Sequence, residues 1–391
     1  MKQVISREAC FWVSAAVVAH TLWTSGAPAM VYPLYARQWH LTSTVTTSIF
    51  AIYPITVVGV LLLFGNLSDY IGRRAVMLLG VLASLIGVLC FATAGSVSAL
   101  LVGRWSMGLG VGLSASPSAA AMVEFSDPLR RDRTGGAITI AQSLGLAAAF
   151  VLGGACIKYL LDPLHSTFWI LSGVLVAVLL AVHFLPIHTS AEASGPWRIQ
   201  IPRVTGELRK TFVVSALSMS TAYALGAITL SLGAQIASDL IRSRDFLING
   251  LSLSLFAIVS GGFAIIGKDV RPRSAITVGG IGSVLSMGLL LISSLLHSLP
   301  AFIAATAAAG FGYSFLVLGG FNELNAKAAG HHRAAAISTA LVLAYLAQSF
   351  SAILLGVVAT KTSLGTAICL GFIGICTLTA FAITFNIMRE P

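Results

Sequence analysis

Long apolar runs, separated by short polar turns, dominate the chain. Each run has about 20 residues or more, which is enough for a helix to cross the apolar layer of a bilayer. The runs occupy residues 10–36, 43–66, 75–95, 99–123, 135–157, 165–186, 212–237, 246–267, 274–296, 300–322, 335–359 and 364–388. This pattern predicts an all-α integral membrane protein with twelve transmembrane helices.

The longest polar stretch lies between the sixth and seventh runs. Residues 187–211 contain Gly195, Pro196 and Pro202 together with several basic residues. Such a composition is typical of a linker. We therefore predict a first six-helix bundle at 1–187, a linker at 188–211 and a second six-helix bundle at 212–391.

Composition supports a membrane protein and excludes a soluble globule. Of 391 residues, 57% are hydrophobic and only 9% are charged, whereas soluble domains carry about 25% charged residues. The five cysteines lie within or beside apolar runs without a C-x-x-C pair, which indicates core residues and no metal site. Lys2 and Arg7 precede the first run as in a signal peptide, but further runs follow at once, so we expect an uncleaved first helix.

The basic residues predict the orientation of the chain. If both termini are cytoplasmic, seventeen of the 23 lysines and arginines face the cytoplasm and Arg104 lies within a run. The five on the opposite side are Arg37, Lys158, Arg242, Arg244 and Lys361. This bias predicts a multi-pass protein of the inner membrane with cytoplasmic termini. The net charge of +10 then belongs to the membrane surface, and no nucleic-acid partner is expected.

Matching charges indicate an internal repeat. Asp69, which follows the second run, has a counterpart in Asp269, which follows the eighth run and precedes Arg273. Glu124 at the end of the fourth run likewise corresponds to Glu323 at the end of the tenth. We therefore expect two related halves.

A ten-residue polar loop provides the most specific motif. Residues 65–74 read GNLSDYIGRR, with Gly65, Asp69, Gly72, Arg73 and Arg74 at fixed spacings. The segment resembles the G-x-L-x-D-x-x-G-R-R loop of the major facilitator superfamily. That resemblance implies two pseudo-symmetric six-helix bundles and transport by alternating access.

The fourth and fifth runs resemble the drug:proton antiporters of that superfamily. Arg104 precedes Gly108, Gly110 and Gly112, as in the R-x-x-x-G-x-G pattern. An arginine within a span needs a polar partner or a water-filled cavity. The fifth run keeps four glycines of the G-x8-G-x3-G-P-x2-G-G pattern but replaces the central Gly-Pro pair by Ala149 and Phe150. The retained residues are Gly136, Gly145, Gly153 and Gly154.

Candidate coupling residues are few. No Asp or Glu lies at the centre of a run, so the usual proton-carrying carboxylate is missing. His20 is the most central titratable residue of the first half, and its ordinary pKa suits a proton switch. We predict His20 and Arg104 as coupling or cavity residues.

The resemblance also predicts where the substrate binds and how access is controlled. The substrate cavity is expected near the midplane between the halves, lined by the first, fourth, seventh and tenth spans with help from the second, fifth, eighth and eleventh. Its candidate substrate-binding residues are Trp23, Tyr53, Gln142, Tyr223, Tyr313, Tyr345 and Gln348. The candidate gating residues are Gly65, Asp69, Gly72, Arg73, Arg74, Glu124, Arg130, Arg131, Asp269 and Arg273. We expect Asp69 and Arg73, with Arg130 or Arg131, to latch the first half against the second in the outward-open state.

The sequence therefore predicts a secondary transporter of a small organic molecule, with proton-coupled efflux as the first hypothesis. Uptake by symport or by facilitated diffusion is the alternative. A membrane enzyme would need a clustered set of catalytic residues, and the runs show no such pattern. A non-transporting sensor usually carries an added soluble domain, and none fits in this chain. We expect no cofactor besides a proton gradient, and a monomer whose partners are the substrate and membrane lipids.

Overall fold

In the first half of the computed structural model, all the regular elements of the described residues are helices. The structure describes residues 5–127, 134–186, 208–327 and 330–388. The first-half elements are α1 (Arg7–Gly26), the 3₁₀ turn η1 (Ala27–Met30), α2 (Tyr32–Gln38), α3 (Ser43–Phe64), α4 (Ser68–Ile71), α5 (Arg73–Ala92), α6 (Val97–Phe125), α7 (Thr134–Tyr159) and α8 (Ser166–His183). The outer part of the first run is irregular, because Pro28 and Pro33 lie in the first turns of η1 and α2 and interrupt a continuous helix.

The second half begins with an unusual helix. Two π-helical turns interrupt it, so that α9 (Arg209–Ala227), η4 (Ile228–Leu232), α10 (Gly233–Gln235) and η5 (Ile236–Leu240) follow one another without a break. The remaining elements are α11 (Phe246–Ile266), η6 (Gly267–Asp269), α12 (Pro272–Leu296), α13 (Leu299–Lys327), α14 (Gly330–Lys361) and α15 (Leu364–Ile387).

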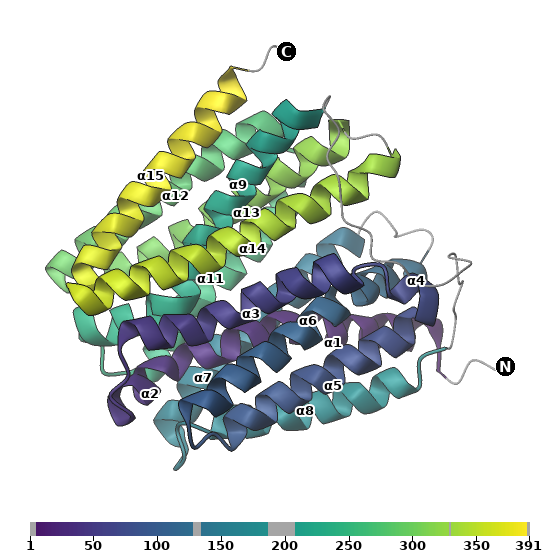
Figure 1. Ribbon diagram of the computed structural model, residues 1–391, viewed down its shortest axis with the longest axis horizontal. Coiled ribbons are helices and arrows are strands. Elements are labelled where there is room, and N and C mark those ends of the chain that lie inside the picture. The colour runs from purple at the N-terminus through teal and green to yellow at the C-terminus, as the bar shows by residue number, and fades with distance from the viewer. Residues whose placement is uncertain (1–4, 128–133, 187–207, 328–329, 389–391) are drawn as a thin grey trace.

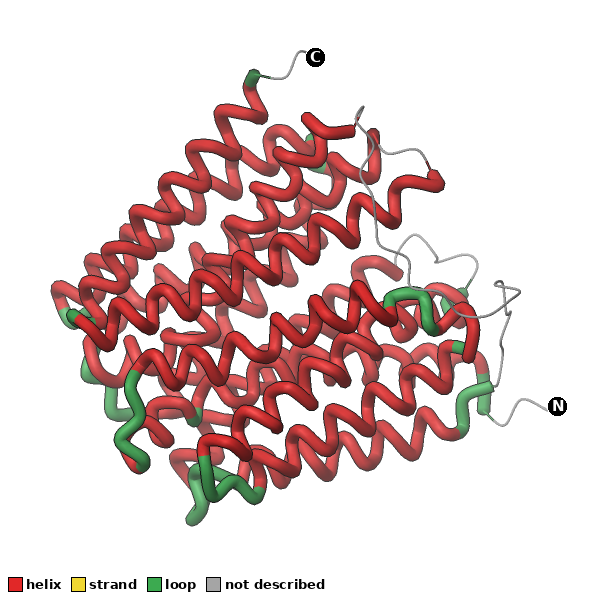
Figure 2. The backbone as a smooth tube through the Cα atoms, in the orientation of Figure 1, coloured by secondary structure: helices red, strands yellow, loops and turns green. Residues whose placement is uncertain are grey.

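The helices fit the predicted membrane architecture. Eleven helical segments of the described chain are long and apolar enough to cross a bilayer. The twelfth position belongs to α1, which is more polar because it carries Arg7, Glu8 and His20. Figure 2 shows helices joined by short loops. The predicted all-α membrane fold is confirmed.

The two halves are separate bundles that meet at two helix pairs. α3 packs on α14, and α7 packs on α11. Figure 1 shows the second half above the first and the halves diverging towards the end where α1 begins and α15 ends. We call this end, which also holds α4, the terminal side, and the opposite end the distal side.

Reciprocal glycine contacts relate the two halves. A Cβ atom at Gly80 would lie 2.7 Å from the Gly110 carbonyl oxygen, and one at Gly110 would lie 2.4 Å from that of Gly80. In the second half, a Cβ atom at Gly279 would lie 3.0 Å from the Gly312 carbonyl oxygen, and one at Gly312 would lie 3.0 Å from that of Gly279. The pairs α5–α6 and α12–α13 therefore pack closely in the same way, as the repeat in the sequence predicts.

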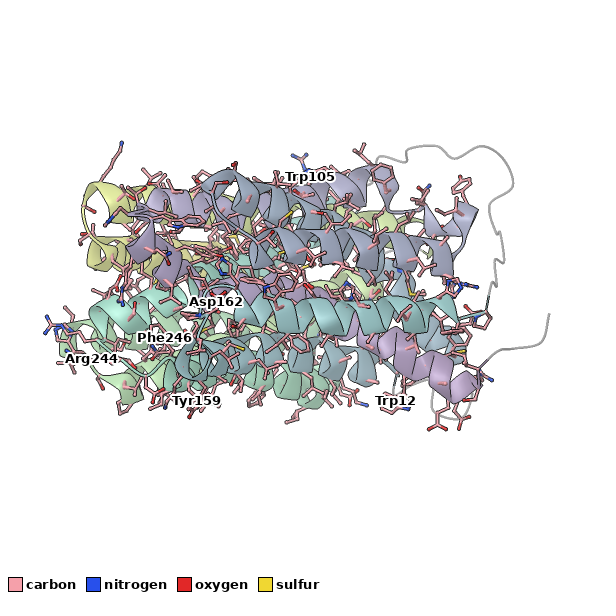
Figure 3. The ribbon with its side chains drawn as sticks, turned by 90° about the horizontal axis from the view of Figure 1, so that it is seen from below. Trp12, Trp105, Tyr159, Asp162, Arg244 and Phe246 are labelled. Atoms are coloured by element: carbon pink, nitrogen blue, oxygen red, sulfur yellow. The ribbon has the colours of Figure 1, made fainter. Side chains whose placement is uncertain are left out.

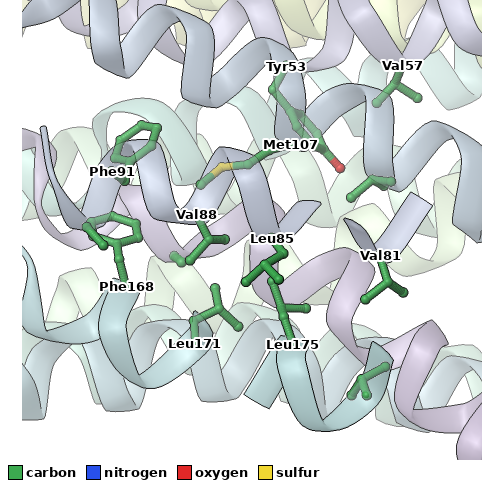
Figure 4. Close-up of a cluster of buried hydrophobic side chains, with 14 of the residues drawn as sticks. Tyr53, Val57, Val81, Leu85, Val88, Phe91, Met107, Phe168, Leu171 and Leu175 are labelled. Atoms are coloured by element: carbon green, nitrogen blue, oxygen red, sulfur yellow. The ribbon is translucent and has the colours of Figure 1, made fainter. Parts of the chain in front are cut away.

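Apolar side chains fill each half. In the first half, α5, α6 and α8 contribute a cluster that includes Val88, Phe91, Met107, Phe168 and Leu171 (Figure 4). A second cluster crosses between the halves, since Met30, Leu146 and Phe150 pack with residues of α9 and α11. This shared core joins the halves around η1 and α7.

Exposed aromatic side chains suit a bilayer environment. Trp12 lies near the terminal end and Tyr159 near the distal end (Figure 3), and both are more than 60% exposed. Such side chains are enriched at the two membrane–water interfaces. The bundle surface between them carries many exposed apolar residues, as expected for contact with lipid.

Candidate functional site

A cavity of about 90 Å³ lies between the two halves. The first half contributes residues from α1, α3 and α7, and the second half from α9, η4, α11, α13 and α14. The lining consists of Leu22, Ser25, Tyr53, Ser143, Leu146, Tyr223, Gly226, Leu230, Phe256, Ala257, Ser260, Tyr313, Tyr345 and Gln348. We call this cavity the central pocket.

Aromatic rings and hydroxyl groups define the chemistry of the central pocket. The rings of Tyr223 and Tyr345 meet edge to face with centroids 4.9 Å apart. Tyr313 lies 5.8 Å from Tyr223 and 5.3 Å from Phe256, again between ring centroids. Among the described residues, the lining has no charged side chain. Such a surface can stack on a flat ring and exchange hydrogen bonds with it.

Five of the seven predicted substrate-binding residues line this pocket. They are Tyr53, Tyr223, Tyr313, Tyr345 and Gln348. The Oε1 atom of Gln348 is buried and has no hydrogen-bond partner among the described residues, so it can accept a bond from a bound molecule. The lining also contains three serines that were not predicted as substrate-binding residues, Ser25, Ser143 and Ser260. An isolated serine in an apolar run gives no signal in the sequence.

Trp23 and Gln142 do not belong to the pocket lining. Trp23 is partly buried and packs against the apolar core of the first half. Gln142 is partly exposed on α7, next to Ser143, which does line the pocket. Helical phase decides this outcome, since adjacent residues on a helix point about 100° apart.

His20 also lies outside the central pocket, contrary to the cavity position predicted for it. Its ring is buried between α1 and α5, where Nδ1 contacts the Val17 carbonyl oxygen and Nε2 lies 3.3 Å from Ser84 Oγ. A carbonyl oxygen only accepts, so Nδ1 carries a proton. The neutral ring with Nε2 free to accept from Ser84 satisfies both contacts, which suits a packing residue.

Arg104 lies directly behind the pocket wall. It is fully buried on α6, and its Nη1 atom donates to the carbonyl oxygen of Ser25 at 3.1 Å. Its guanidinium carbon lies 4.7 Å from the ring centroid of Tyr53 and 5.5 Å from that of Phe50. Contrary to prediction, α6 contributes nothing to the described lining, since Tyr53 and Ser25 stand between Arg104 and the cavity.

The glycine-rich motifs of the fourth and fifth spans serve helix packing. On α6, a Cβ atom at Gly108 would lie 2.7 Å from the Tyr53 carbonyl oxygen of α3. On α7, Gly145 packs against the Ala19 backbone, where an added Cβ atom would lie 2.0 Å from the carbonyl oxygen. Gly154 packs in the same way against Phe246, with 2.4 Å between an added Cβ atom and the carbonyl oxygen. α7 therefore contacts α1 and α11 closely, and a larger residue at either glycine would separate them.

The polar loop after α3 makes a sharp turn at the terminal side. Gly72 has φ 89°, a conformation that favours glycine. Gly65 has φ −57°, so it does not need this freedom. Asp69 is exposed and accepts a long hydrogen bond from Ser68 Oγ (3.4 Å).

Arg73 pairs within its own half. Its Nη1 atom contacts the Glu124 carboxylate at the end of α6. Arg7, which the sequence did not single out, donates to the carbonyl oxygens of Glu124 (3.1 Å) and Ser126 (2.7 Å) and so caps α6. Arg74 borders the same small pocket as Arg73 and Glu124. Arg130 and Arg131, the predicted latch partners, lie outside the described residues.

The corresponding loop of the second half also forms local contacts. Asp269 lies 4.0 Å from the Nζ atom of Lys268, and both side chains are largely exposed. The carbonyl oxygen of Arg273 accepts from Asn386 Nδ2 at 3.0 Å. Glu323 pairs with Lys327 one turn later, at 3.1 Å. The predicted latch between halves is thus absent from the described contacts of Asp69 and Asp269.

The distal side, in contrast, carries polar contacts between the halves. Arg37 pairs with Asp239 at 2.9 Å, and Lys158 pairs with Asp245 at 2.5 Å. The hydroxyl groups of Thr44 and Thr360 are 2.9 Å apart. The sequence did not predict these pairs, whose members are far apart along the chain.

Asp245 has three partners at this side. Besides Lys158, its Oδ1 atom accepts from the backbone N–H groups of Leu247 (2.9 Å) and Ile248 (3.2 Å) and so caps α11. The hydrogen bond from Lys158, followed by those from Ile248 and Leu247, holds the pKa of this carboxyl below its ordinary value.

Close helix contacts reinforce the distal closure. A Cβ atom at Gly250 would lie 2.4 Å from the Phe150 carbonyl oxygen, and one at Gly356 would lie 1.8 Å from Thr47 Oγ1. These glycines let α11 approach α7 and let α14 approach α3. The halves are therefore held together on the distal side and diverge towards the terminal side (Figure 1).

Known proteins share this fold and family. The sequence profile of the Major Facilitator Superfamily matches residues 12–352. The chain belongs to the Major Facilitator Superfamily. It is a multi-pass membrane protein of paired bundles with a pocket between them.

Among curated relatives, Myo-inositol transporter 1 of Cryptococcus neoformans is 32% identical over 91 residues, and Probable plastidic glucose transporter 2 of Arabidopsis thaliana is 33% identical over 89 residues. Each match covers 23% of this chain, and only 16% and 18% of those relatives respectively. The matched segments therefore represent a small part of each relative.

Solved structures of the superfamily superpose over nearly the whole chain. The nucleoside transporter NupG, crystallised as a variant, gives a TM-score of 0.77 at 12% identity and covers 97% of this chain and 99% of its own. The peptide transporter POT, crystallised with sulfate, gives a TM-score of 0.77 at 16% identity, covering 97% of this chain and 93% of its own. These similarities show a common fold.

Proposed function

We propose that this transporter carries a small organic molecule, with one ring and several hydrogen-bonding groups, through the central pocket by alternating access. The observation that supports this most directly is the lining of the pocket: four tyrosines, Phe256, Gln348 and three serines, contributed by both halves. A molecule held by both halves can move from one side to the other when they rock about it.

The relatives are consistent with this size and chemistry. Their names refer to inositol, glucose, nucleosides and peptides. Inositol, glucose and nucleosides combine a ring with several hydroxyl groups, which tyrosine, serine and glutamine side chains can bind. We propose a substrate of comparable size, with the rings of Tyr223 and Tyr313 packed against its flat face.

We further propose that the terminal side is cytoplasmic and that the protein resides in the inner membrane, because basic residues are concentrated on that side. The structure is then an inward-facing state whose distal side is closed by Arg37–Asp239 and Lys158–Asp245. On this proposal the substrate exchanges with the cytoplasm in the present state.

For the direction of transport we propose uptake, driven by the substrate gradient or by symport. The described pocket lining includes no carboxylate and no histidine that could exchange a proton as the cavity alternates. Proton-coupled export remains a second proposal, supported by the similarity of the α7 glycines to the antiporter pattern. A pH jump across proteoliposomes separates the two, because antiport predicts substrate-dependent alkalinisation of the acidic side.

The pocket itself can be tested with purified protein. Thermal unfolding is screened against inositols, hexoses, nucleosides and aromatic acids at two pH values, since a bound ligand raises the melting temperature. Tyr223→Ala should abolish stabilisation by the hits, because it removes the ring that contacts both Tyr313 and Tyr345. Tyr159→Ala is the matched control on the exposed surface. Equal stabilisation of Tyr223→Ala and the wild type would contradict the proposed pocket.

A further inference from the structure

The guanidinium group of Arg104 is the buried cation nearest the central pocket. Its side chain is fully buried within the first half, whereas Arg37, Arg73, Lys158 and Lys327, which form ion pairs, lie near helix ends. Removing a charge from water costs several kcal/mol unless partners replace the lost hydration. The partners of Arg104 therefore decide what its charge does.

Those partners satisfy only part of the guanidinium. Nη1 donates to the Ser25 carbonyl oxygen at 3.1 Å, and the rings of Phe50 and Tyr53 pack against its face. Nε and Nη2 are buried and have no hydrogen-bond partner in the part of the chain that the structure describes. Nε and Nη2 lie on one edge of the planar group, which is the edge that a carboxylate contacts with both oxygens.

No carboxylate of the described chain meets this edge. The described ion pairs place Glu124 with Arg73, Asp239 with Arg37 and Asp245 with Lys158, all towards the ends of helices. In the sequence, moreover, no Asp or Glu lies at the centre of an apolar run. The positive charge behind the pocket is therefore not neutralised by an acid of the described chain.

Arg104 is separated from the central pocket by one layer of residues. Ser25, whose carbonyl oxygen it contacts, and Tyr53, whose ring covers it, are both lining residues. The described lining residues carry no charge, so the field of Arg104 dominates in this low-dielectric interior. A cation in the pocket would be repelled and an anion attracted.

We infer that Arg104 recognises a small monovalent anion, a carboxylate or a halide, that enters from the central pocket. The anion is either a carboxylate group on the transported molecule or a free inorganic ion bound beside it. Binding requires Tyr53 to turn aside so that Nε and Nη2 face the pocket. This inference extends the proposed function, because it adds a charge to the ring-bearing substrate class.

Matched probes test the inference on the purified full-length protein. Benzoate and benzamide have the same ring and nearly the same shape, but only benzoate is an anion. Chloride, compared with the divalent anion sulfate at equal ionic strength, represents the free inorganic source. Melting temperatures are measured for the wild type, Arg104→Gln, Arg104→Lys and the exposed control Arg244→Gln.

The expected result is a higher melting temperature with benzoate than with benzamide, or with chloride than with sulfate, in the wild type and in Arg244→Gln. Arg104→Gln should lose the difference. Arg104→Lys should bind the anion about tenfold more weakly, because an ammonium group lacks the planar fork. The lysine variant decides the matter if the glutamine variant does not fold.

The probes also separate the two sources and the two proposals. A benzoate response that chloride does not produce identifies a carboxylate on the substrate, whereas a chloride response that competes with benzoate identifies a free ion. Anion responses that are absent, or equal in Arg104→Lys and the wild type, would overturn the role of Arg104. If benzamide or a neutral hit still stabilised the wild type but not Tyr223→Ala, the proposed pocket would stand without it.

Discussion

The two ends of this molecule bear their charges differently. On the distal side Arg37 and Lys158 pair with Asp239 and Asp245 of the other half. On the terminal side Arg73 pairs with Glu124 of its own half. The distal side thus has few basic residues but uses two of them to join the halves, whereas the terminal side has many and uses Arg73 within one bundle.

This difference shows how one fold can be closed on one side while its other side stays open. The side chains of the two distal ion pairs are each about one third exposed or more, so each pair contributes little to the stability of the closed side. The larger contribution comes from glycine-mediated contacts between α7 and α11 and between α3 and α14. A closed side built in this way can open without breaking a strong, buried ion pair.

The largest effect is expected from locking the distal side. The hydroxyl groups of Thr44 and Thr360 are 2.9 Å apart, so cysteines at these positions lie within reach of each other. In a background without the native cysteines, oxidation of Thr44→Cys with Thr360→Cys should reduce transport to background, because the halves can no longer separate there. Transport in proteoliposomes is measured before and after reduction.

Reduction should restore transport, and each single cysteine variant should be insensitive to the oxidant. Full transport by the cross-linked protein would show that the distal side need not open.

A smaller but still large effect is expected from Gly250→Ala. The added Cβ atom would lie 2.4 Å from the Phe150 carbonyl oxygen and push α11 from α7. Overpacking of this kind costs about 1–3 kcal/mol, so the melting temperature and the fraction closed at the distal side should both fall. Gly262→Ala is the control on the same helix, since its Cβ atom meets open space. Equal behaviour of the two variants would contradict the packing role of Gly250.

The terminal loops should respond unequally to neutralisation. We predict that Asp69→Asn lowers transport about tenfold, equivalent to a population shift of roughly 1.4 kcal/mol. Its melting temperature should stay unchanged, because the side chain is exposed and its described hydrogen bond is long. Asp269→Asn should have a weaker effect, since its loop lacks the second glycine of the motif. Initial transport rates and unfolding curves are compared, and unchanged transport in Asp69→Asn would exclude the latch.

The smallest effect is expected at Lys158–Asp245. Lys158→Gln should raise the fraction open at the distal side only a few-fold, because the pair is partly exposed. Since the folded-state pKa of Asp245 lies below its ordinary value of 3.8, its stabilising contribution is complete at neutral pH and is lost as the pH falls through the lowered pKa. Labelling of a distal cysteine should therefore be constant from pH 7 to pH 5, and a change within that range would point to another group.

Much of this architecture follows from local patterns in the sequence. Apolar runs of about 20 residues predicted the membrane-spanning helices. The pocket tyrosines Tyr223, Tyr313 and Tyr345 were found because the family resemblance indicates which helices face the interface. Charges matched between halves predicted the repeat, which the reciprocal glycine contacts bear out.

Helical phase and long-range pairing account for what was missed. Trp23, Gln142 and His20 lie on the expected helices but do not face the pocket. Arg104 was singled out because it lies within a span, but its place behind Tyr53 depends on the packing of α6 against α3. Arg37 and Asp239 are 202 residues apart along the chain, so only the folded arrangement shows that they pair.

Spin-label distances on both sides of the protein test alternating access most directly. One label pair replaces Thr44 and Thr360 on the distal side, and a second pair replaces the exposed residues Ile71 and Lys268 on the terminal side. Distances are measured with and without a stabilising ligand from the thermal screen. We predict opposite changes, with the distal distance increasing in the molecules whose terminal distance decreases. Distances that stay fixed on both sides, or that increase together, would contradict a rocking motion that closes one side as it opens the other.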